Sequence, residues 1–394
     1  MLSSLKGGND SRVMEFVLLG LSSTWELQLL LFLIFSMFYM AIVLGNILII
    51  VTVKADGHLI QSPMYFFLAH LSFIDLCLGC VTVPKMLGDF LHQRKIISFP
   101  GCLAQIYFLH FLGASEMFLL TVMAYDRYVA ICNPLHYLTV MHRQLCFNLV
   151  AASWFGGFLH SITQVLLVIQ LPFCGPNELD NFYCDVPQVI KLACMDTYVV
   201  EVLMVSNSGL LSLICFLILL LSYAVILATL RTRFRQGQSK ALSTCASHLT
   251  VVSLIFVPCV FIYLRPFCSF PVDKVFSVFY TVITPLLNPL IYTLRNSEMK
   301  TAMRKMRKKK EPLGQSEGGG GTTRSCSIIC MSETDVNTAD TFWKKANSEL
   351  MDQCSLRLLE LPSLVEKNII CGDPVEEATK ISGDSGEGGG LNDL

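Results

Sequence analysis

Charged residues are scarce in this sequence. Only 15% of the 394 residues are charged, whereas 53% are hydrophobic, and the formal net charge is −1. A soluble domain carries about 25% charged residues, so a single soluble fold is excluded, and the near-zero charge argues against a strongly basic nucleic-acid binder. The sequence also lacks an H-E-x-x-H motif and any internal duplication. These absences argue against an enzyme and against a transporter built from inverted repeats.

The small net charge conceals two unlike regions. Residues 1–310 contain 23 Lys and Arg against 15 Asp and Glu, whereas residues 311–394 contain 6 against 15. The second region has the glycine runs Gly318–Gly321 and Gly388–Gly390, mixed polar residues and no sustained periodicity. Such a composition is typical of disorder. We therefore predict an apolar, membrane-embedded region followed by a disordered acidic tail.

Long apolar stretches predict seven membrane-spanning helices. A helix needs about 20 apolar residues to cross a bilayer; five such runs carry no charge, and two more carry one acid each. Core helices of soluble proteins keep a polar face, which these runs lack. The predicted spans are roughly Leu27–Val53, Ser62–Pro84, Phe99–Tyr125, Gln144–Asn177, Val202–Leu230, Ala241–Leu264 and Val275–Leu294. The expected fold class is all-α, a seven-helix bundle over residues 27–294.

Basic residues between the spans collect on one side. The segments of that side and the end of the receptor region carry 15 Lys and Arg, against 8 on the other side. Lys and Arg are retained on the cytoplasmic face of a membrane, so we expect residues 1–26 outside the cell and the C-terminus inside. The one N-x-S/T sequon, Asn9-Asp10-Ser11, falls on the expected outer side and makes Asn9 a candidate glycosylation site.

The 16 cysteines divide by compartment. Those expected near the outer surface could form two disulfides, and spacing alone does not choose among the three pairings; they are Cys102, Cys174, Cys184 and Cys194. The Cys77-x-x-Cys80 pattern resembles a redox motif but lies inside a span, where cysteine behaves as a small hydrophobic residue. Cys326 and Cys330 are expected in the cytosol, as free thiols or acylation sites.

Five motifs occur in order along the predicted receptor region: PMYFFL at 63–68, MAYDRYVAIC at 123–132, PLHY at 134–137, KALSTCASH at 240–248 and PLLNPLIY at 285–292. Together with Gly45-Asn46 and Trp154, they closely resemble the odorant (olfactory) receptor family of rhodopsin-like G-protein-coupled receptors. The resemblance covers about residues 15–306. It implies a receptor that binds small hydrophobic odorants and activates a heterotrimeric G protein of the stimulatory olfactory type, which raises cAMP.

Charge and proline at the expected inner membrane edge predict a switch. Arg127 is a permanent cation with Asp126 beside it as a counter-charge, although an arginine at a helix end can also rest there without a role. Asn288-Pro289 interrupts the hydrogen-bond ladder of the last span and predicts a kink. The resemblance assigns coupling or switch roles to Asp126, Arg127, Tyr128, Tyr223, His248, Asn288, Pro289 and Tyr292.

Asp75 and Glu116 are the only acids deep within the predicted spans. An ionisable residue at that depth is a functional hypothesis by default, and the equivalent pair in the family resembles an allosteric sodium site. The alternative is a protonated carboxyl that serves only helix packing. We expect no other cofactor or metal.

The resemblance also implies a ligand pocket and its cover. Cys102 is expected to pair with Cys184, and Cys174 with Cys194, which would hold the intervening loop over the pocket. The ligand-facing positions carried over are His110, Gly113, Ala114, Met204, Asn207, Ser208, Cys259, Tyr263 and Thr281. This mostly apolar set suits small volatile molecules with one polar function.

Two absences and one departure refine the ligand prediction. The span Val275–Leu294 contains no Lys, which excludes a retinal Schiff base, and Leu109 stands where amine receptors carry an acid. The segment Phe256-Val257-Pro258 departs from the two aromatics and glycine of many family members, which weakens any inference about the pocket floor.

The expected location is the plasma membrane, in olfactory sensory cilia by resemblance, with residues 295–310 forming an amphipathic eighth helix that rests on membrane lipid. Family members usually end near residue 310. We interpret residues 311–394 as an addition by alternative splicing or read-through, or as a regulatory tail. The alternatives to an odorant receptor are a receptor-derived product that does not signal and a multi-span transporter.

Overall fold

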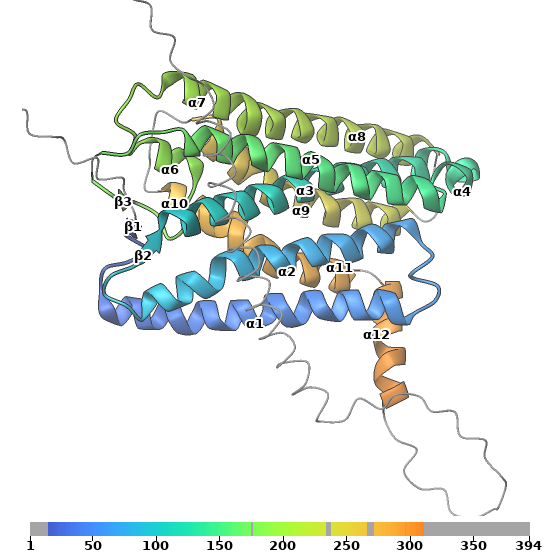
Figure 1. Ribbon diagram of the computed structural model, residues 1–394. Helices are drawn as coiled ribbons and strands as arrows, with labels where there is room; N and C mark the ends of the chain where they lie inside the picture. Colours follow the sequence, from blue (N-terminus) through green and yellow to red (C-terminus); the bar gives the residue numbers. More distant parts are fainter. Residues whose placement is uncertain (1–14, 175, 234–237, 266–271, 296, 311–394) are drawn as a thin grey trace, which may run out of the picture. The chain divides into compact units, whose positions relative to one another are not determined.

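The structure is a computed structural model that describes residues 15–174, 176–233, 238–265, 272–295 and 297–310. Asn9, Cys326, Cys330 and the predicted tail lie outside the described residues. Seven helical spans run alongside one another (Figure 1), which confirms the all-α, seven-helix prediction. The spans are α1 (Trp25–Ala55), α2 (Pro63–Phe90), α3 (Phe99–Cys132), α5 (Arg143–Ile169), α7 (Tyr198–Met204) with η2 (Val205–Leu210) and α8 (Leu211–Arg233), α9 (Gln238–Tyr263), and α10 (Val272–Val278) with η3 (Phe279–Ile283) and α11 (Thr284–Arg295).

The burial of these helices is that of a membrane bundle. Six spans are long and apolar enough to cross a bilayer, and the apolar stretch found in α9 is His248–Tyr263. In α1 only 17% of the most apolar window is buried, and Leu33, Met37 and Leu44 face outward. The corresponding window of α3 is 67% buried, because α3 packs against α2, α5, α8 and α9. Outward apolar faces are stable in lipid, so the chain is a multi-pass membrane protein.

Three predicted spans end six or more residues away from the helix ends in the structure. The third span was expected to end at Tyr125, but α3 continues to Cys132. The fourth span was expected to reach Asn177, but α5 ends at Ile169 and the charge-free run continues as a loop through Pro172 and Cys174. The second span was expected to end at Pro84, but α2 continues to Phe90 with that proline inside it. A proline removes one backbone N–H and does not by itself end a helix that its neighbours pack against. Charge patterns locate a span without fixing its last turn.

Three short strands gather at one end of the bundle, here called the sheet end. Strand β1 (Glu15–Leu18) lies between β2 (Ile96–Ser98) and β3 (Glu178–Leu179), antiparallel to the first and parallel to the second. The buried Lys95 side chain donates to the carbonyl oxygens of Leu19 (3.3 Å) and Ser22 (3.0 Å). Burial lowers the pKa of this lysine. The segment before α1 is thus fastened across the loops of the sheet end, which the sequence did not predict.

The opposite end, here called the α12 end, carries two short elements and one amphipathic helix. They are η1 (Pro134–His136), α4 (Tyr137–Val140) and α12 (Ser297–Lys310) (Figure 1). Met299 and Ala302 of α12 are buried, and Glu298 accepts a hydrogen bond from Tyr65 at 2.9 Å. The basic residues Arg304 and Lys305 are exposed. This short helix agrees with the predicted eighth helix.

Candidate functional site

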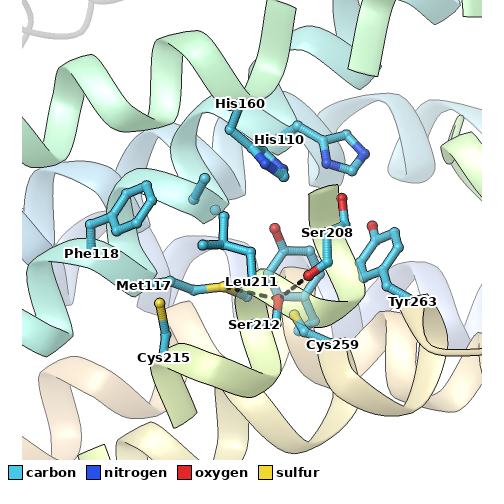
Figure 2. A pocket seen from close by; sticks show the side chains of 13 residues that line it. His110, Met117, Phe118, His160, Ser208, Leu211, Ser212, Cys215, Cys259 and Tyr263 are labelled. Atoms are coloured by element: carbon cyan, nitrogen blue, oxygen red, sulfur yellow. Dashed lines mark hydrogen bonds between the residues drawn. The ribbon is translucent and has the colours of Figure 1, made fainter. Parts of the chain in front are cut away.

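A small cavity lies between α3, α5, α8, α9 and η3 (Figure 2). Its volume is about 20 Å³, room for about one water molecule. The α3 residues that line it recur every three or four positions, as one helix face requires. The lining residues are His110, Gly113, Ala114, Met117, Phe118, His160, Ser208, Leu211, Ser212, Cys215, Cys259, Tyr263 and Tyr280.

Two π-helical turns shape this cavity, and such turns are frequent at functional sites. In η2 a Cβ atom at Gly209 would lie 2.6 Å from the Tyr263 carbonyl oxygen, so glycine allows the fifth and sixth spans to approach. In η3 Tyr280 donates to the Leu109 carbonyl oxygen at 3.4 Å, and a Cβ atom at Gly113 would collide with its hydroxyl group. Large side chains such as that of Tyr280 must move before the cavity can admit a ligand bigger than a water molecule.

Six of the nine predicted ligand positions line the cavity: His110, Gly113, Ala114, Ser208, Cys259 and Tyr263. The other three lie elsewhere. Met204 is fully buried in the apolar cluster near the Cys102–Cys184 bridge. Asn207 donates to the His160 carbonyl oxygen at 3.5 Å, and the Thr281 hydroxyl donates to the Ser277 carbonyl oxygen at 2.8 Å.

Sequence reasoning missed seven lining residues: Met117, Phe118, His160, Leu211, Ser212, Cys215 and Tyr280. Helical spacing carried a signal for most of them. Met117 and Phe118 follow Gly113 and Ala114 by four positions, and Ser212 follows Ser208 by four. His160 had no such signal, because no ligand position was expected on the fourth span.

The loop over the sheet end is held by two disulfides. Cys102 of α3 is bonded to Cys184, with the Cα atoms 5.4 Å apart, and Cys174 is bonded to Cys194, with the Cα atoms 5.9 Å apart. The Cys184 N–H also donates to Gln105 Oε1 of α3 at 2.9 Å. Cys77 and Cys80 are free thiols. The loop is therefore joined covalently to the helix that forms one wall of the cavity.

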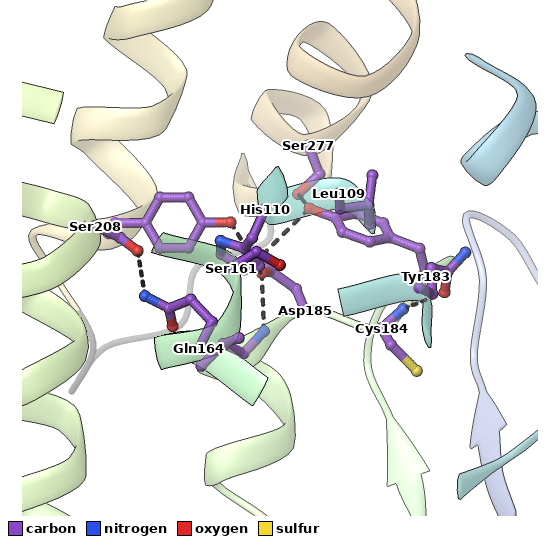
Figure 3. A network of polar contacts seen from close by, with 12 residues as sticks. Leu109, His110, Ser161, Gln164, Tyr183, Cys184, Asp185, Ser208 and Ser277 are labelled. Atoms are coloured by element: carbon purple, nitrogen blue, oxygen red, sulfur yellow. Dashed lines mark hydrogen bonds and ion pairs between the residues drawn. The ribbon is translucent and has the colours of Figure 1, made fainter. Parts of the chain in front are cut away.

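Asp185 follows Cys184 and organises a polar cluster above the cavity (Figure 3). Its carboxylate is 3% exposed and accepts hydrogen bonds from the Tyr263 hydroxyl (2.9 Å), the Tyr183 hydroxyl (3.2 Å) and the Val186 N–H (2.9 Å). The His110 Nε2 atom lies 3.8 Å from the same carboxylate. We call Asp185, Tyr183, Tyr263 and His110 the lid network.

The Tyr183 hydroxyl group of the lid network stays protonated. Burial, and then the neighbouring Asp185 carboxylate, raise the pKa of Tyr183 far above its ordinary value. Tyr183 therefore remains a hydrogen-bond donor, placed between Asp185 and the Ser277 hydroxyl at 3.3 Å. Sequence reasoning missed Asp185, because its only distinguishing feature was its position beside a cysteine.

A second polar cluster lies between α2, α3 and α11. The Asn288 amide nitrogen donates to both oxygens of the fully buried Asp75, at 3.0 and 2.9 Å. Both carboxylate oxygens of Glu116, Asn288 Oδ1 and the Tyr292 hydroxyl are buried and have no hydrogen-bond partner among the described residues. We call Asp75, Glu116, Asn288 and Tyr292 the core network. Its unpartnered oxygen atoms are the donor type that hard cations such as sodium prefer.

The predicted switch residues divide between two places: Asn288 and Tyr292 belong to the core network, and Asp126 and Arg127 lie near α4 at the α12 end of the bundle. Arg127 forms an ion pair with Asp126, whose other carboxylate oxygen accepts a hydrogen bond from Tyr137 of α4 at 2.8 Å. The Tyr223 hydroxyl is hydrogen-bonded to His248 Nδ1. Tyr128 is partly buried against the core, and Pro289 lies inside α11 with its ring near Gly45. A half-buried arginine is thus paired with an acid that also accepts from Tyr137, and breaking this pair would release the arginine.

Comparison with known proteins agrees with this architecture. A family profile described as olfactory receptor matches residues 35–310. Olfactory receptor 4Q3 of Homo sapiens is 81% identical over 303 residues, which cover 77% of this chain and 97% of that protein. Olfactory receptor 4Q2 of Homo sapiens is 61% identical over 76% of this chain and 95% of that protein. Olfactory receptor 4M1 of Mus musculus is 59% identical over 77% of this chain and 97% of that protein. With matches over most of the chain at such identities, the chain belongs to the olfactory receptor family, whose members are signalling receptors and not enzymes.

Proposed function

We propose that the chain binds small volatile molecules in the cavity between α3, α5, α8, α9 and η3 and activates a stimulatory, olfactory-type G protein that raises cAMP. The observation that carries the proposal is the layout of α3. One face of this helix lines the mostly apolar cavity from His110 to Phe118, and the same helix continues to the Asp126–Arg127 pair. A ligand at one end therefore acts on a helix that also holds the coupling residues.

In this proposal the sheet end faces outside the cell and the α12 end faces the cytosol. The disulfides lie at the sheet end, which suits an oxidising compartment, and the basic residues of α12 suit anionic lipid on the cytosolic face. The location would be the plasma membrane of olfactory cilia. The ligand shifts the equilibrium toward the signalling arrangement only by binding that arrangement more tightly.

We also propose that the core network holds a sodium ion in the resting receptor. Asp75 and Glu116 would provide the carboxylate oxygens, with Asn288 Oδ1 beside them, and the ion would supply the positive charge that offsets two buried acids. The unpartnered oxygens of Glu116 support this assignment.

Ligand-evoked cAMP in transfected cells tests the function directly. We expect cAMP to rise with at least one odorant, and we expect Arg127→Ala to abolish the rise while surface labelling stays normal. Arg143→Ala is the matched control, because Arg143 starts α5 at the same end and lies over the Phe147 ring instead of an acid. A chain that reaches the surface but raises no cAMP would be the non-signalling product.

A further inference from the structure

Most hydroxyl groups around the cavity donate hydrogen bonds to other groups of the protein. Tyr263 donates to Asp185, Tyr280 to the Leu109 carbonyl oxygen and Ser212 to the Ser208 carbonyl oxygen at 2.6 Å. In this arrangement the protons of these three hydroxyl groups are already used. Among the other polar residues that line the cavity, His160 has a buried ring nitrogen without a hydrogen-bond partner among the described residues, Ser208 has a hydroxyl group, and the His110 ring lies 3.8 Å from Asp185.

His160 presents an unused acceptor. The residue is 9% exposed, lines the cavity, and its Nδ1 atom has no hydrogen-bond partner within the described part of the chain. The Asn207 amide nitrogen donates to the His160 carbonyl oxygen at 3.5 Å. A nitrogen of a neutral imidazole accepts a hydrogen bond when the proton is on the other nitrogen, so the unpartnered Nδ1 can receive a hydroxyl proton.

Ser208 presents an unused donor nearby. Its Oγ accepts from Gln164 Nε2 at 2.7 Å, and in the described residues its own hydroxyl proton has no acceptor. Gln164 lies four positions after His160, so both project from the same face of α5. His160 and Ser208 both border the same cavity (Figure 2).

The cavity lining offers no oppositely charged residue to a charged ligand. None of the 13 lining residues is Lys, Arg, Asp or Glu, so a carboxylate would be buried without a cation, at high cost. Asp185, the acid just above, already receives three hydrogen bonds and adjoins His110. An ammonium group would have to displace one of those donors. The cavity thus disfavours both acids and amines.

We propose that this receptor selects neutral molecules that carry a hydroxyl group, namely alcohols or phenols. His160 and Ser208 are the residues that form hydrogen bonds with this hydroxyl group. The ligand hydroxyl donates to His160 Nδ1 and accepts from Ser208, and its carbon skeleton packs on Met117, Phe118 and Leu211. A ketone, ester or ether can only accept, so it leaves the buried His160 lone pair unpaired. The inference rests on the proposed function of this cavity.

Matched compounds test the selectivity. The full chain is expressed with a surface tag and exposed to sets of volatiles in which one carbon skeleton carries a hydroxyl, aldehyde, methyl ether, carboxylic acid or amine. Octan-1-ol and 2-phenylethanol head two such sets. We expect the most potent agonists to be hydroxyl compounds, about 10- to 100-fold more potent than their ethers. If the most potent agonist of each set lacked a hydroxyl group, the inference would be overturned and the proposed function would remain. No cAMP response to any compound, from a chain at the surface, would overturn both.

Variants separate recognition from folding. We expect His160→Phe to reduce the alcohol-to-ether potency ratio about 10-fold or more, and His160→Gln to restore part of the ratio through its acceptor oxygen. Ser208→Ala should lower the potency of alcohols and ethers together and leave the ratio nearly unchanged, because both can accept from Ser208. Thr163→Val is the control, because Thr163 lies on the exposed face of the same helix with its hydroxyl bonded to Leu159. Thermal stabilisation of the purified receptor by the alcohol reports binding without signalling. A His160→Phe receptor that loses all ligands equally, with the ratio unchanged, would contradict the assignment.

Discussion

The lid network and the core network differ in how completely their polar groups are satisfied. In the lid network the Asp185 carboxylate receives three hydrogen bonds, and a disulfide fixes the neighbouring Cys184. In the core network Glu116 and Tyr292 have buried oxygen atoms that no described residue pairs. A satisfied buried network specifies one arrangement, whereas unpaired groups are stabilised by finding new partners. We therefore expect the lid to act as a fixed frame and the core to be the part of the receptor that rearranges.

Breaking the frame should have the largest effect. Cys102→Ser removes the bridge that closes an 82-residue separation, and losing such a bridge typically costs about 2–5 kcal/mol. We expect most of the receptor to be lost from the cell surface, as measured by labelling of intact cells. Cys77→Ala, which removes a free thiol in α2, should leave surface labelling nearly normal. Normal surface levels and response in Cys102→Ser would refute a fixed lid.

A matched pair of tyrosines compares the two networks directly. Tyr263→Phe removes a donor to buried Asp185, and we expect it to lower the free energy of unfolding by about 1–3 kcal/mol. Tyr292→Phe removes a hydroxyl group that has no partner among the described residues, so we expect a change of less than about 0.5 kcal/mol. Thermal unfolding of the two purified receptors measures both. Equal losses would remove the distinction between the networks.

Signalling should reverse that order. Tyr292→Phe removes a hydroxyl group that is free to take a new partner in the active arrangement. We therefore expect this variant to lose more of its ligand-evoked cAMP response than Tyr263→Phe does, although it loses less stability. A Tyr292→Phe receptor with a normal cAMP response would show that this hydroxyl group has no part in the rearrangement.

The comparison also shows what the sequence could predict. Long apolar runs, five without charge and two with one acid each, predicted the seven helices because the bilayer requires about 20 apolar residues per span. The opposite charges of Asp126 and Arg127 indicated their pairing. The strands β1 to β3 were missed, because four residues or fewer carry no reliable alternation and their pairing joins segments far apart in sequence. The ends of α2 and α3 were predicted too early and the end of α5 too late, because packing, not charge, decides where these helices end.

The pocket shows the same limit. His110 and Ser208 were predicted, whereas His160 and Asp185 were not. His160 reaches the cavity from the fourth span only through tertiary packing, and Asp185 is held beside the lining residues Tyr263 and His110 by a loop whose position depends on a disulfide. The unpaired state of Glu116 and Tyr292 is likewise invisible in sequence, because it depends on which donors the fold brings near.

The sodium dependence of basal cAMP should be a smaller effect, and it tests the core network by itself. If sodium stabilises the resting core, replacing sodium by choline in receptor membranes should raise basal cAMP by about fivefold or less. Asp75→Asn should abolish this dependence, because it removes the carboxylate that holds Asn288 and would hold the ion. Asp196→Asn, at an exposed loop acid, should keep it. Basal signalling that ignores sodium in the unmodified receptor would leave Asp75 and Glu116 as packing carboxyls.

The smallest effect is expected from the acidic tail, because neither network includes any of it. The cavity, the lid and Arg127 all lie before residue 310, where the family match also ends. Truncation after Lys310 should leave surface level and odorant potency unchanged within the error of a cAMP assay. Truncation after Arg295 is the contrast: it removes α12, whose Met299 and Ala302 are buried and whose Glu298 accepts from Tyr65, and it should lower the surface level clearly. If the first truncation alone abolished the response, residues 311–394 would be a working part of the receptor, and the rearranging part could not be confined to the core between the spans.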